Sequence, residues 1–425
     1  MKILVLGGGG REHTIIKKLQ ESPRVSTIFA LPGNGGISYD ARCENISALD
    51  LDQGVEFALE NGIDFAVVGP DDPLAKGAVD RFVRAGIPAF GPDSAAATIE
   101  SSKVFSKNLM KKYNIPTAEY EIFDSANAAI SYIETLGRFP VVLKADGLAL
   151  GKGVIIAEDF EEARNGVHAI MTERVFGDSG NRIVIEEYLT GPEVSVLAFT
   201  DSKTLVPMVS SMDHKRALDG DIGPNTGGMG TVAPNPFYTE TIAAQCMKEI
   251  FLPTMAAMNV EGRPFKGCLY FGLMLTEAGP KVIEYNCRFG DPEAQVVLPL
   301  LETDLFTIME AIAEERLSEV SVTFRKGAAC CVIAASGGYP GNYEKDLPIS
   351  GLEKGQLPGV SIFHAGTKRT AEGLVTAGGR VLGVTGVADT LGDAVNRAYG
   401  ALESIEFKGM YYRRDIGKKA LLELE

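Results

Sequence analysis

The chain has 425 residues, of which 45% are hydrophobic and 23% charged, as is typical of a globular protein with roughly two to four domains. Its net charge of −15 argues against general binding to nucleic acid or to an anionic membrane, since both require a basic surface. The six cysteines have no metal-ligand or disulfide spacing, and no signal peptide or apolar run near the ~20 residues of a membrane span is recognisable. We therefore expect a cytoplasmic protein without zinc.

The first hundred residues alternate between predicted strands and helices. Strands are expected at 2–6, 27–31, 65–69 and 88–91, and helices at 11–20, 51–61 and 73–85. This alternation predicts a doubly wound parallel sheet, in which ligands bind beyond the carboxyl ends of the strands. Those ends carry polar, turn-rich segments at 7–10, 32–36 and 69–73.

The glycine run Gly7–Gly10 first suggests a dinucleotide-binding fold. The fingerprint fails, however, because Glu12 or His13 stands where the third glycine is required, and no carboxylate follows the second strand. The glycines still expose backbone N–H groups and a helix N-terminus to an anion. We interpret the run as a site for a phosphorylated metabolite rather than NAD; a purely structural turn is the alternative.

A second unit is predicted from about residue 101 to 190. It is expected to contain helices at 101–113 and 160–171 and strands at 141–145, 154–157 and 182–188. The hairpin tip at 147–153 is rich in glycine, follows Lys144 and contains Lys152, so it suits phosphate oxygens. It is not a Walker A loop, because Gly153 follows Lys152. An ordinary hairpin tip without a ligand is the alternative interpretation of this loop. For the carboxylates at 186–193, solvated surface charge is the alternative to a role in binding.

The remainder of the chain is predicted to form two further units. The expected elements are a polar loop at 213–230, helices at 240–258 and 389–405, and strands at 268–276, 281–286, 328–335, 361–365 and 380–386. The loop is too polar and glycine-rich for a core, and long functional loops have this character. Within it, His214 lacks neighbouring metal ligands, so we expect a hydrogen-bonded loop histidine.

The strand that ends at Asn286 carries the most informative side chains. Glu284 and Asn286 share one strand face, and Arg288 follows two residues later. One carboxylate and one amide oxygen suit Mg²⁺, and a guanidinium beside the metal suits a developing anion. An edge strand with a local ion pair is the alternative. No acyl-enzyme or zinc-hydrolase motif is present, which favours phosphoryl chemistry achieved by positioning and charge neutralisation.

Several motifs in this order resemble one ATP-grasp family over essentially the whole chain. They are GGGGREH (7–13), VGPDDPLAKG (68–77), KADGLALGKGV (144–154), DHKRALDGDIGPNTGGMG (213–230), IEYNCRFGDPE (283–293), SGGYPGNY (336–343) and FHAGT (363–367). The chain is therefore similar to the phosphoribosylamine–glycine ligase family. That resemblance implies an ATP-dependent ligation of glycine to 5-phosphoribosylamine through glycyl phosphate, in purine biosynthesis.

The resemblance also implies an architecture and partners. It implies a multidomain α/β and α+β protein with a doubly wound N-terminal sheet (1–100), a two-lobed ATP-grasp core (101–190 and 191–325) and a β-rich C-terminal domain (326–425). ATP is the implied co-substrate and Mg²⁺ or Mn²⁺ the implied metal. A transient contact with the enzyme that supplies phosphoribosylamine is a further expectation.

The site residues implied by the resemblance fall into four groups. The metal ligands are Glu284 and Asn286. The ATP-binding residues are Lys103, Lys144, Gly147, Gly151, Lys152, Gly153, Glu186, Glu187, Tyr188, Leu189 and Glu193. The substrate-binding residues are Gly8, Gly9, Asn34, Asp213, Lys215, Thr226, Gly228, Arg288 and Asp291. Arg288, Asp213 and Lys144 are the residues expected to act in catalysis.

Departures and alternatives accompany this assignment. Ser101 replaces the glycine more usual before Ser-Lys, and residues 269–276 offer no second metal carboxylate. Another ATP-grasp ligase or carboxylase is the nearest alternative function. A nucleotide-binding regulator without turnover would not require Lys144, Glu284, Asn286 and Arg288 together, and the failed fingerprint argues against a dehydrogenase.

Overall fold

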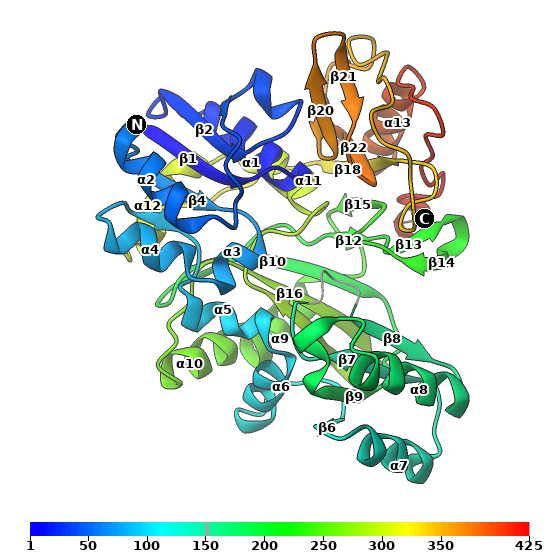
Figure 1. Ribbon diagram of the computed structural model, residues 1–425. Coiled ribbons are helices and arrows are strands. Elements are labelled where there is room, and N and C mark those ends of the chain that lie inside the picture. The colour runs from blue at the N-terminus through cyan, green and yellow to red at the C-terminus, as the bar shows by residue number, and fades with distance from the viewer. Residues whose placement is uncertain (149–152, 425) are drawn as a thin grey trace.

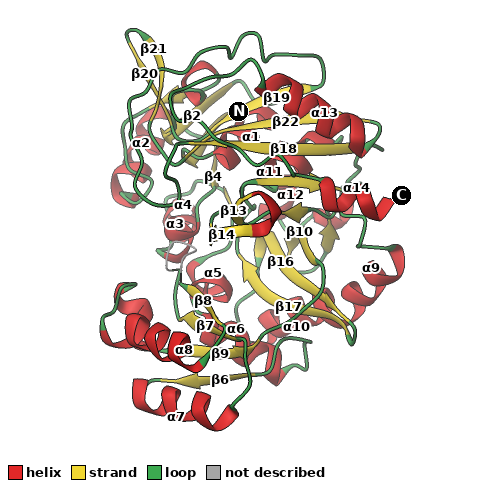
Figure 2. Ribbon diagram, turned by 90° about the vertical axis from the view of Figure 1, so that its right-hand side faces the viewer, coloured by secondary structure: helices red, strands yellow, loops and turns green. Residues whose placement is uncertain are grey.

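A computed structural model describes residues 1–148 and 153–424 of the chain. The described part contains four sheets of four or five strands each and two short two-stranded pairs. One of the four is a central antiparallel sheet, and the other three are neighbours of it. In Figures 1 and 2 the central sheet lies between a smaller lobe below and the N-terminal and C-terminal sheets above. The predicted mixture of α/β and α+β units is confirmed. Among the described residues, no helix is long and apolar enough to cross a membrane.

The N-terminal sheet is entirely parallel, with strand order β3-β2-β1-β4-β5. Its strands are β1 (Lys2–Gly7), β2 (Thr27–Pro32), β3 (Arg42–Cys43), β4 (Phe65–Val68) and β5 (Ala89–Phe90). Its helices are α1 (Gly10–Gln20), α2 (Leu51–Asn61), α3 (Asp71–Ala75), α4 (Ala78–Arg84) and α5 (Ser94–Ser101). The helix predicted at 73–85 is two helices, because Gly77 adopts a φ of 81° between them.

The smaller lobe contains an antiparallel sheet of order β6-β9-β7-β8 with two helices against it. Its elements are α6 (Lys103–Lys112), β6 (Tyr120–Phe123), α7 (Ala126–Leu136), β7 (Val141–Ala145), β8 (Val154–Ala157), α8 (Phe160–Val167) and β9 (Ile183–Glu187). The helix predicted at 101–113 begins at Lys103 instead, because the Ser102 hydroxyl caps it by accepting a bond from Phe105 N. Strand β6 and helix α7 had no counterpart in the sequence prediction.

The central antiparallel sheet has the order β11-β10-β16-β17. Its strands are β10 (Glu193–Asp201), β11 (Leu205–Pro207), β16 (Lys266–Thr276) and β17 (Gly279–Asn286), and its helices include α9 (Glu240–Cys246), α10 (Leu252–Val260), α11 (Ala294–Val297) and α12 (Leu305–Ala313). The long helix predicted at 240–258 is interrupted by a π-helical turn at Met247–Phe251. A bulge opposite Gly272 and Leu273 makes Ile283 an extra residue in β17, just before Glu284.

The C-terminal sheet, of order β12-β15-β18-β22-β19, recruits two strands from the middle of the chain. Its strands are β12 (Met212–Asp213), β15 (Gly230–Ala233), β18 (Ala328–Ala335), β19 (Val360–His364) and β22 (Arg380–Ala388). Two short pairs, β13 (Arg216–Leu218) with β14 (Ile222–Asn225) and β20 (Thr367–Thr370) with β21 (Gly373–Thr376), and the helices α13 (Leu391–Leu402) and α14 (Lys418–Leu424) accompany it. The polar loop predicted at 213–230 is therefore anchored in the C-terminal sheet at both ends.

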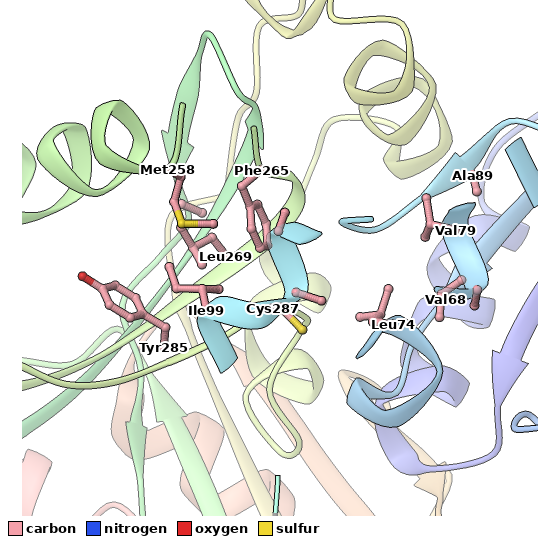
Figure 3. Close-up of a cluster of buried hydrophobic side chains, with 14 of the residues drawn as sticks. Val68, Leu74, Val79, Ala89, Ile99, Met258, Phe265, Leu269, Tyr285 and Cys287 are labelled. Carbon is pink, nitrogen blue, oxygen red and sulfur yellow. The ribbon is translucent and has the colours of Figure 1, made fainter. Parts of the chain in front are cut away.

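Two hydrophobic clusters join the N-terminal sheet to the central one, and the first of them underlies strand β17. This first cluster includes Val68, Leu74 and Val79 from the N-terminal side and Leu269 and Tyr285 from the central sheet. Figure 3 shows these side chains, with Ile99 and Cys287 lying where the two groups approach each other. Because close-packed interiors resist deformation, this junction fixes the backbone that leads from β17 to Arg288.

Candidate active site

A cleft of about 1000 Å³ runs between the smaller lobe, the central sheet and the C-terminal sheet. It is lined by residues that are far apart in the sequence, from Arg11 and Asp71 to Lys418 and Lys419. Most of the predicted site residues line it: Lys103, Lys144, Gly147, Gly153, Glu186, Glu187, Tyr188, Leu189, Glu193, Asp213, Lys215, Thr226, Glu284, Asn286, Arg288 and Asp291. The structure thus brings together residues from five separate segments of the sequence.

One end of the cleft gathers lysines around a buried carboxylate. The Nζ atoms of Lys144 and Lys107 lie 2.9 Å and 3.0 Å from Glu186 Oε2. Lys103 Nζ donates to Gly147 O at 2.6 Å, at the base of the glycine-rich hairpin tip. Burial lowers the pKa of Lys107 to about 8, although Glu186 opposes that shift. We call Lys103, Lys107, Lys144 and Glu186 the nucleotide side of the cleft.

An apolar wall borders the nucleotide side. Val142, Val154, Ile156, Met274 and Ile283 line the cleft beside Tyr188 and Leu189. Glu186 Oε1 is buried there and has no hydrogen-bond partner among residues 1–148 and 153–424. A flat apolar slot with one free acceptor suits a heteroaromatic base that carries an amino group.

The two predicted metal ligands, Glu284 and Asn286, lie on β17 and line the cleft. Withdrawal from water would raise the pKa of Glu284, but Lys215, Lys144, Lys103 and Arg288 together hold it below its usual value. The carboxylate is therefore ionised, as a ligand of a hard divalent cation must be. No cluster of three or more His, Cys, Asp or Glu side chains occurs in the described part of the chain. A carboxylate and an amide that leave most positions to water and phosphate fit Mg²⁺ rather than zinc.

Arg288 lies beyond the end of β17, where two carboxylates orient it. One of its terminal nitrogens, Nη2, lies 3.0 Å from Glu100 Oε1 and 3.9 Å from Asp71 Oδ2. Glu100 Oε2 also accepts a bond from Cys287 N at 2.7 Å, so the same carboxylate fixes the backbone and the guanidinium. Arg288 Nε is buried without a partner among the described residues and remains available to an anion.

The polar segment 213–230 brings Asp213 to this end of the cleft, near Glu293. Desolvation, and then the nearby Glu293, raise the pKa of Asp213 well above its usual value. Glu293 accepts bonds from Ser195 and from Tyr270, whose oxygen atoms lie 3.3 Å and 3.2 Å from its Oε1. Two neighbouring carboxylates in a desolvated site favour a bound cation, because a cation relieves their repulsion.

Gly228 brings the segment 213–230 against Pro292, in the loop that follows β17. It has a φ of 111°, and a Cβ at this position would lie 2.5 Å from Pro292 and 2.7 Å from Asp213. Only glycine fits there, although Gly228 itself is not among the residues that line the cleft. Nearby, Lys215 Nζ donates to Glu193 Oε2 at 2.9 Å, and the Thr226 hydroxyl donates to Lys215 O at 2.9 Å. We call Asp213, Lys215, Arg288 and Glu293 the substrate side of the cleft.

Besides Gly228, three predicted substrate residues lie outside the lining of the cleft. Asn34 Nδ2 donates to Gly8 O at 2.9 Å and to His364 O at 2.8 Å, so its amide joins the N-terminal and C-terminal sheets. Gly9 N donates to Glu12 Oε2 at 2.7 Å, which places a carboxylate of the protein at the N-terminus of α1. The assignment of Gly8, Gly9 and Asn34 to a sugar phosphate stays a prediction. The predicted residues Gly151 and Lys152 lie outside the described residues.

Sequence reasoning missed several residues that shape the cleft. Lys107 lies on the helix predicted at 101–113 and Glu100 just before it, where the sequence alone does not distinguish a buried side chain from a solvated one. Glu293 belongs to the motif NCRFGDPE, so its carboxylate was available as a signal. Arg380 Nη1 reaches the cleft from β22 and donates to Asp291 O at 2.6 Å. Only the tertiary fold places Arg380 there, since nothing near it in the sequence indicates a site.

Comparison with known protein families finds matches along nearly the whole chain. Residues 1–100, 101–294 and 329–419 match the N domain, the ATP-grasp (A) domain and the C domain of phosphoribosylglycinamide synthetase. The chain is 49% identical over 423 residues to a phosphoribosylamine–glycine ligase of Halalkalibacterium halodurans, with 100% of this chain and 98% of the relative covered. It is 47% identical to the ligase of the same name from Caldanaerobacter subterraneus subsp. tengcongensis, covering 98% and 99%.

Solved structures give the same fold. The crystal structure of phosphoribosylamine–glycine ligase from Thermotoga maritima matches with a TM-score of 0.84 at 32% identity, covering 98% of this chain and 100% of that one. A biotin carboxylase domain of the Hydrogenobacter thermophilus 2-oxoglutarate carboxylase, solved with MgADP and bicarbonate, matches with a TM-score of 0.73 at 18% identity, covering 100% and 94%. The second likeness concerns the fold alone.

Proposed function

The chain belongs to the phosphoribosylglycinamide synthetase family and is an ATP-dependent ligase that joins glycine to 5-phosphoribosylamine; we propose that the two sides of its cleft divide the work. The nucleotide side binds ATP and the substrate side activates glycine. The observation that carries this proposal is the pair of buried, unpartnered polar atoms, Glu186 Oε1 at one end and Arg288 Nε at the other. Buried polar groups without partners mark places where a ligand completes the hydrogen bonding.

ATP is proposed to lie with its base in the apolar slot. There Glu186 Oε1 accepts a hydrogen bond from the amino group of adenine, and the exposed carboxylate of Glu193 is placed for the ribose. Lys103 and Lys144 then face the phosphates, beside the hairpin tip that contains Gly147 and Gly153. Compact ammonium groups neutralise phosphate oxygens without requiring a fixed bidentate geometry.

A divalent cation, Mg²⁺ or Mn²⁺, is proposed to be held by Glu284 and Asn286, because carboxylate and amide oxygens suit both ions. When bound, such an ion neutralises charge on the phosphates during transfer. The four cations that hold Glu284 ionised also lie where a triphosphate requires positive charge. Residues 269–276 contain no carboxylate that could bind a second cation.

Glycine is proposed to lie on the substrate side. Its ammonium group faces Asp213 and Glu293, while its carboxylate faces Arg288. That carboxylate attacks the γ-phosphate and forms glycyl phosphate, and the amine of phosphoribosylamine then displaces phosphate. Neither step needs a protein nucleophile, in agreement with the side chains that line the cleft. Arg288 would stabilise the negative charge that grows on the acyl phosphate oxygens.

The test is to measure ADP release with each substrate omitted in turn, using phosphoribosylamine formed freshly from ribose 5-phosphate and ammonia. We expect ADP and phosphate to appear in step with glycinamide ribonucleotide, and little ADP without glycine. Bicarbonate in place of glycine separates the ligase from a carboxylase. AMP and pyrophosphate as products, or ADP release that depends on bicarbonate, would contradict the proposal.

Two further features belong to the same proposal. The reaction is expected to take place in the cytoplasm, where ATP, glycine and reduced cysteines coexist. A transient contact with the enzyme that supplies phosphoribosylamine remains a prediction.

A further inference from the structure

The β13–β14 pair in the middle of the segment 213–230 has almost no hydrophobic support of its own. Leu218 and Ile222, its large apolar side chains, are 51% and 62% exposed, and Ala217 is its buried residue. A two-stranded pair without an apolar face is marginal in water. Its turn also contains Asp221 at a φ of 56°, a conformation that costs energy for a residue with a side chain. Contacts from elsewhere must therefore keep this pair in place.

The C-terminal end of the chain supplies those contacts through Arg413. This arginine is 2% exposed, and its Nη1 donates to Asp221 Oδ1 at 2.8 Å and to Arg216 O at 3.1 Å. Its other nitrogens, Nε and Nη2, donate to the two oxygens of Asp415 at 2.8 Å each. Bidentate pairing of this kind fixes the plane of the guanidinium, so that Nη1 is aimed at the turn.

Neighbouring residues reinforce this contact. Asp415 Oδ2 accepts a bond from Gly220 N at 2.8 Å, and Asp219 Oδ1 accepts one from Arg414 N at 2.7 Å. Gly417 N donates to His214 Nε2 at 3.3 Å, while His214 Nδ1 lies 3.0 Å from Gly230 O. The C-terminal residues 413–417 therefore bind the segment at its turn and near its start. We call these contacts the C-terminal clasp.

The far end of the segment is held from the C-terminal sheet as well. Arg380 Nη1 donates to Gly227 O at 2.7 Å, and Gly227 N donates to the Tyr339 hydroxyl at 3.3 Å. Both ends of the segment that carries Asp213, Lys215 and Gly228 thus depend on side chains from the last hundred residues. Arg380 also contacts Asp291 in the cleft, so Arg413 is the cleaner residue to vary.

We propose that Arg413 is a positioning residue for the ligase: through the C-terminal clasp it holds the segment 213–230 in the conformation that binds glycine. The proposal rests on the proposed function in one respect, the assignment of Asp213 and its neighbours to glycine. Arg413 acts through the segment and not on the nucleotide side, where Lys107, Lys144 and Glu186 hold one another without it.

The test compares the full-length parent with Arg413→Gln by hydrogen exchange without ligands and by steady-state kinetics. We expect amides at 216–225 to exchange about tenfold faster, since a lost hydrogen bond to a charged group typically costs that much or more. The KM for glycine should rise about tenfold while the KM for ATP stays within about twofold. The matched control is Arg397→Gln, which removes an arginine of the same region that donates to Val387 O at 2.6 Å and does not touch the segment.

Each outcome decides the proposal. Unchanged hydrogen exchange of the amides at 216–225 overturns the proposal. Faster exchange with an unchanged KM for glycine overturns it too, and so does an equal rise of the KM for glycine and the KM for ATP. If Arg413→Gln does not fold, Asp221→Asn decides instead, because that side chain is 63% exposed and asparagine tolerates the turn conformation. It should shift both readouts about threefold in the same direction, and no shift overturns the proposal. A parent without glycine-dependent ADP release refutes the proposed function, and hydrogen exchange alone then decides whether the clasp holds the segment.

Discussion

The two sides of the cleft are built differently. The nucleotide side is local: Lys103 and Lys107 come from one helix, Lys144 and Glu186 from adjacent strands of one small sheet, and Lys144 pairs with Glu186 at 2.9 Å. The substrate side is assembled from distant parts of the chain. There Arg288 meets Glu100, almost two hundred residues earlier, and Asp213 lies on a strand of the C-terminal sheet.

This difference has a physical consequence. On the nucleotide side, Lys107, Lys144 and Glu186 restrain one another within one lobe, and Lys144 makes one further bond, to Ile283 O of the central sheet at 3.1 Å. ATP binding should therefore tolerate most changes elsewhere. On the substrate side, each group is oriented by a partner from another region, so small displacements alter the geometry where the chemistry occurs. We therefore expect variants of the substrate side to affect turnover, and variants of the nucleotide side to affect ATP affinity.

The largest expected effect is that of Arg288→Lys. Lysine keeps the charge but loses planar two-point donation, which matters most where the carboxylate becomes an acyl phosphate. Loss of one such donor typically costs about 2.7–4 kcal/mol, or roughly 10²–10³ in rate. Turnover should fall by that factor while the KM for ATP changes little. Turnover within a few-fold of the parent at saturating substrates would make Arg288 structural.

A smaller effect is expected of Glu284→Gln, at the boundary between the two sides. Glutamine keeps an oxygen but loses the charge that balances a divalent cation. The Mg²⁺ concentration that gives half-maximal activity should rise by about 100-fold or more, because loss of a mere outer-shell partner already costs roughly 10–100-fold and Glu284 is a proposed direct ligand. The control is Glu302→Gln, on a carboxylate outside the cleft lining. An unchanged Mg²⁺ requirement would remove Glu284 from the metal site.

Sequence reasoning succeeded where the chemistry is local. The strand that carries Glu284 and Asn286, and the hairpin around Gly147, could be predicted because periodicity and glycine content report on a few neighbouring residues. The partners of Arg288 could not, because the contact with Glu100 depends on how two sheets pack. The recruitment of residues 212–233 into the C-terminal sheet was missed for the same reason. Pairing between distant strands leaves no local pattern.

The pH dependence of stability should report on the substrate side. Burial lowers the pKa of His214 to about 4, so the folded protein keeps this side chain neutral. The unfolded chain binds a proton near pH 6.5, so stability is fully present above that value and falls as the pH falls toward 4. His214 alone should account for about 2 kcal/mol between pH 7 and pH 5. Urea unfolding of the parent and of His214→Gln, at a series of pH values, measures this contribution to the free energy of unfolding. If the two proteins lose stability equally between pH 7 and pH 5, the contribution of His214 is contradicted.

The smallest expected effect is that of Lys107→Met on the nucleotide side. Its folded pKa of about 8 means that the positive charge is present below pH 8 and is lost above it. Removal of the ammonium should raise the KM for ATP about tenfold at pH 7, the scale of one hydrogen bond to a charged group. The parent's KM for ATP should rise between pH 7 and pH 9, and the variant's should rise less. Equal pH profiles would show that Lys107 does not contribute.

The division of the cleft is tested most directly by one paired measurement: the KM for ATP, the KM for glycine and kcat of Lys107→Met and Arg288→Lys, determined side by side at pH 7. We predict opposite patterns. Lys107→Met should raise the KM for ATP with kcat nearly intact, and Arg288→Lys should lower kcat with the KM for ATP nearly intact. If both variants change the same constants by similar factors, the cleft acts as one undivided site and the account is contradicted.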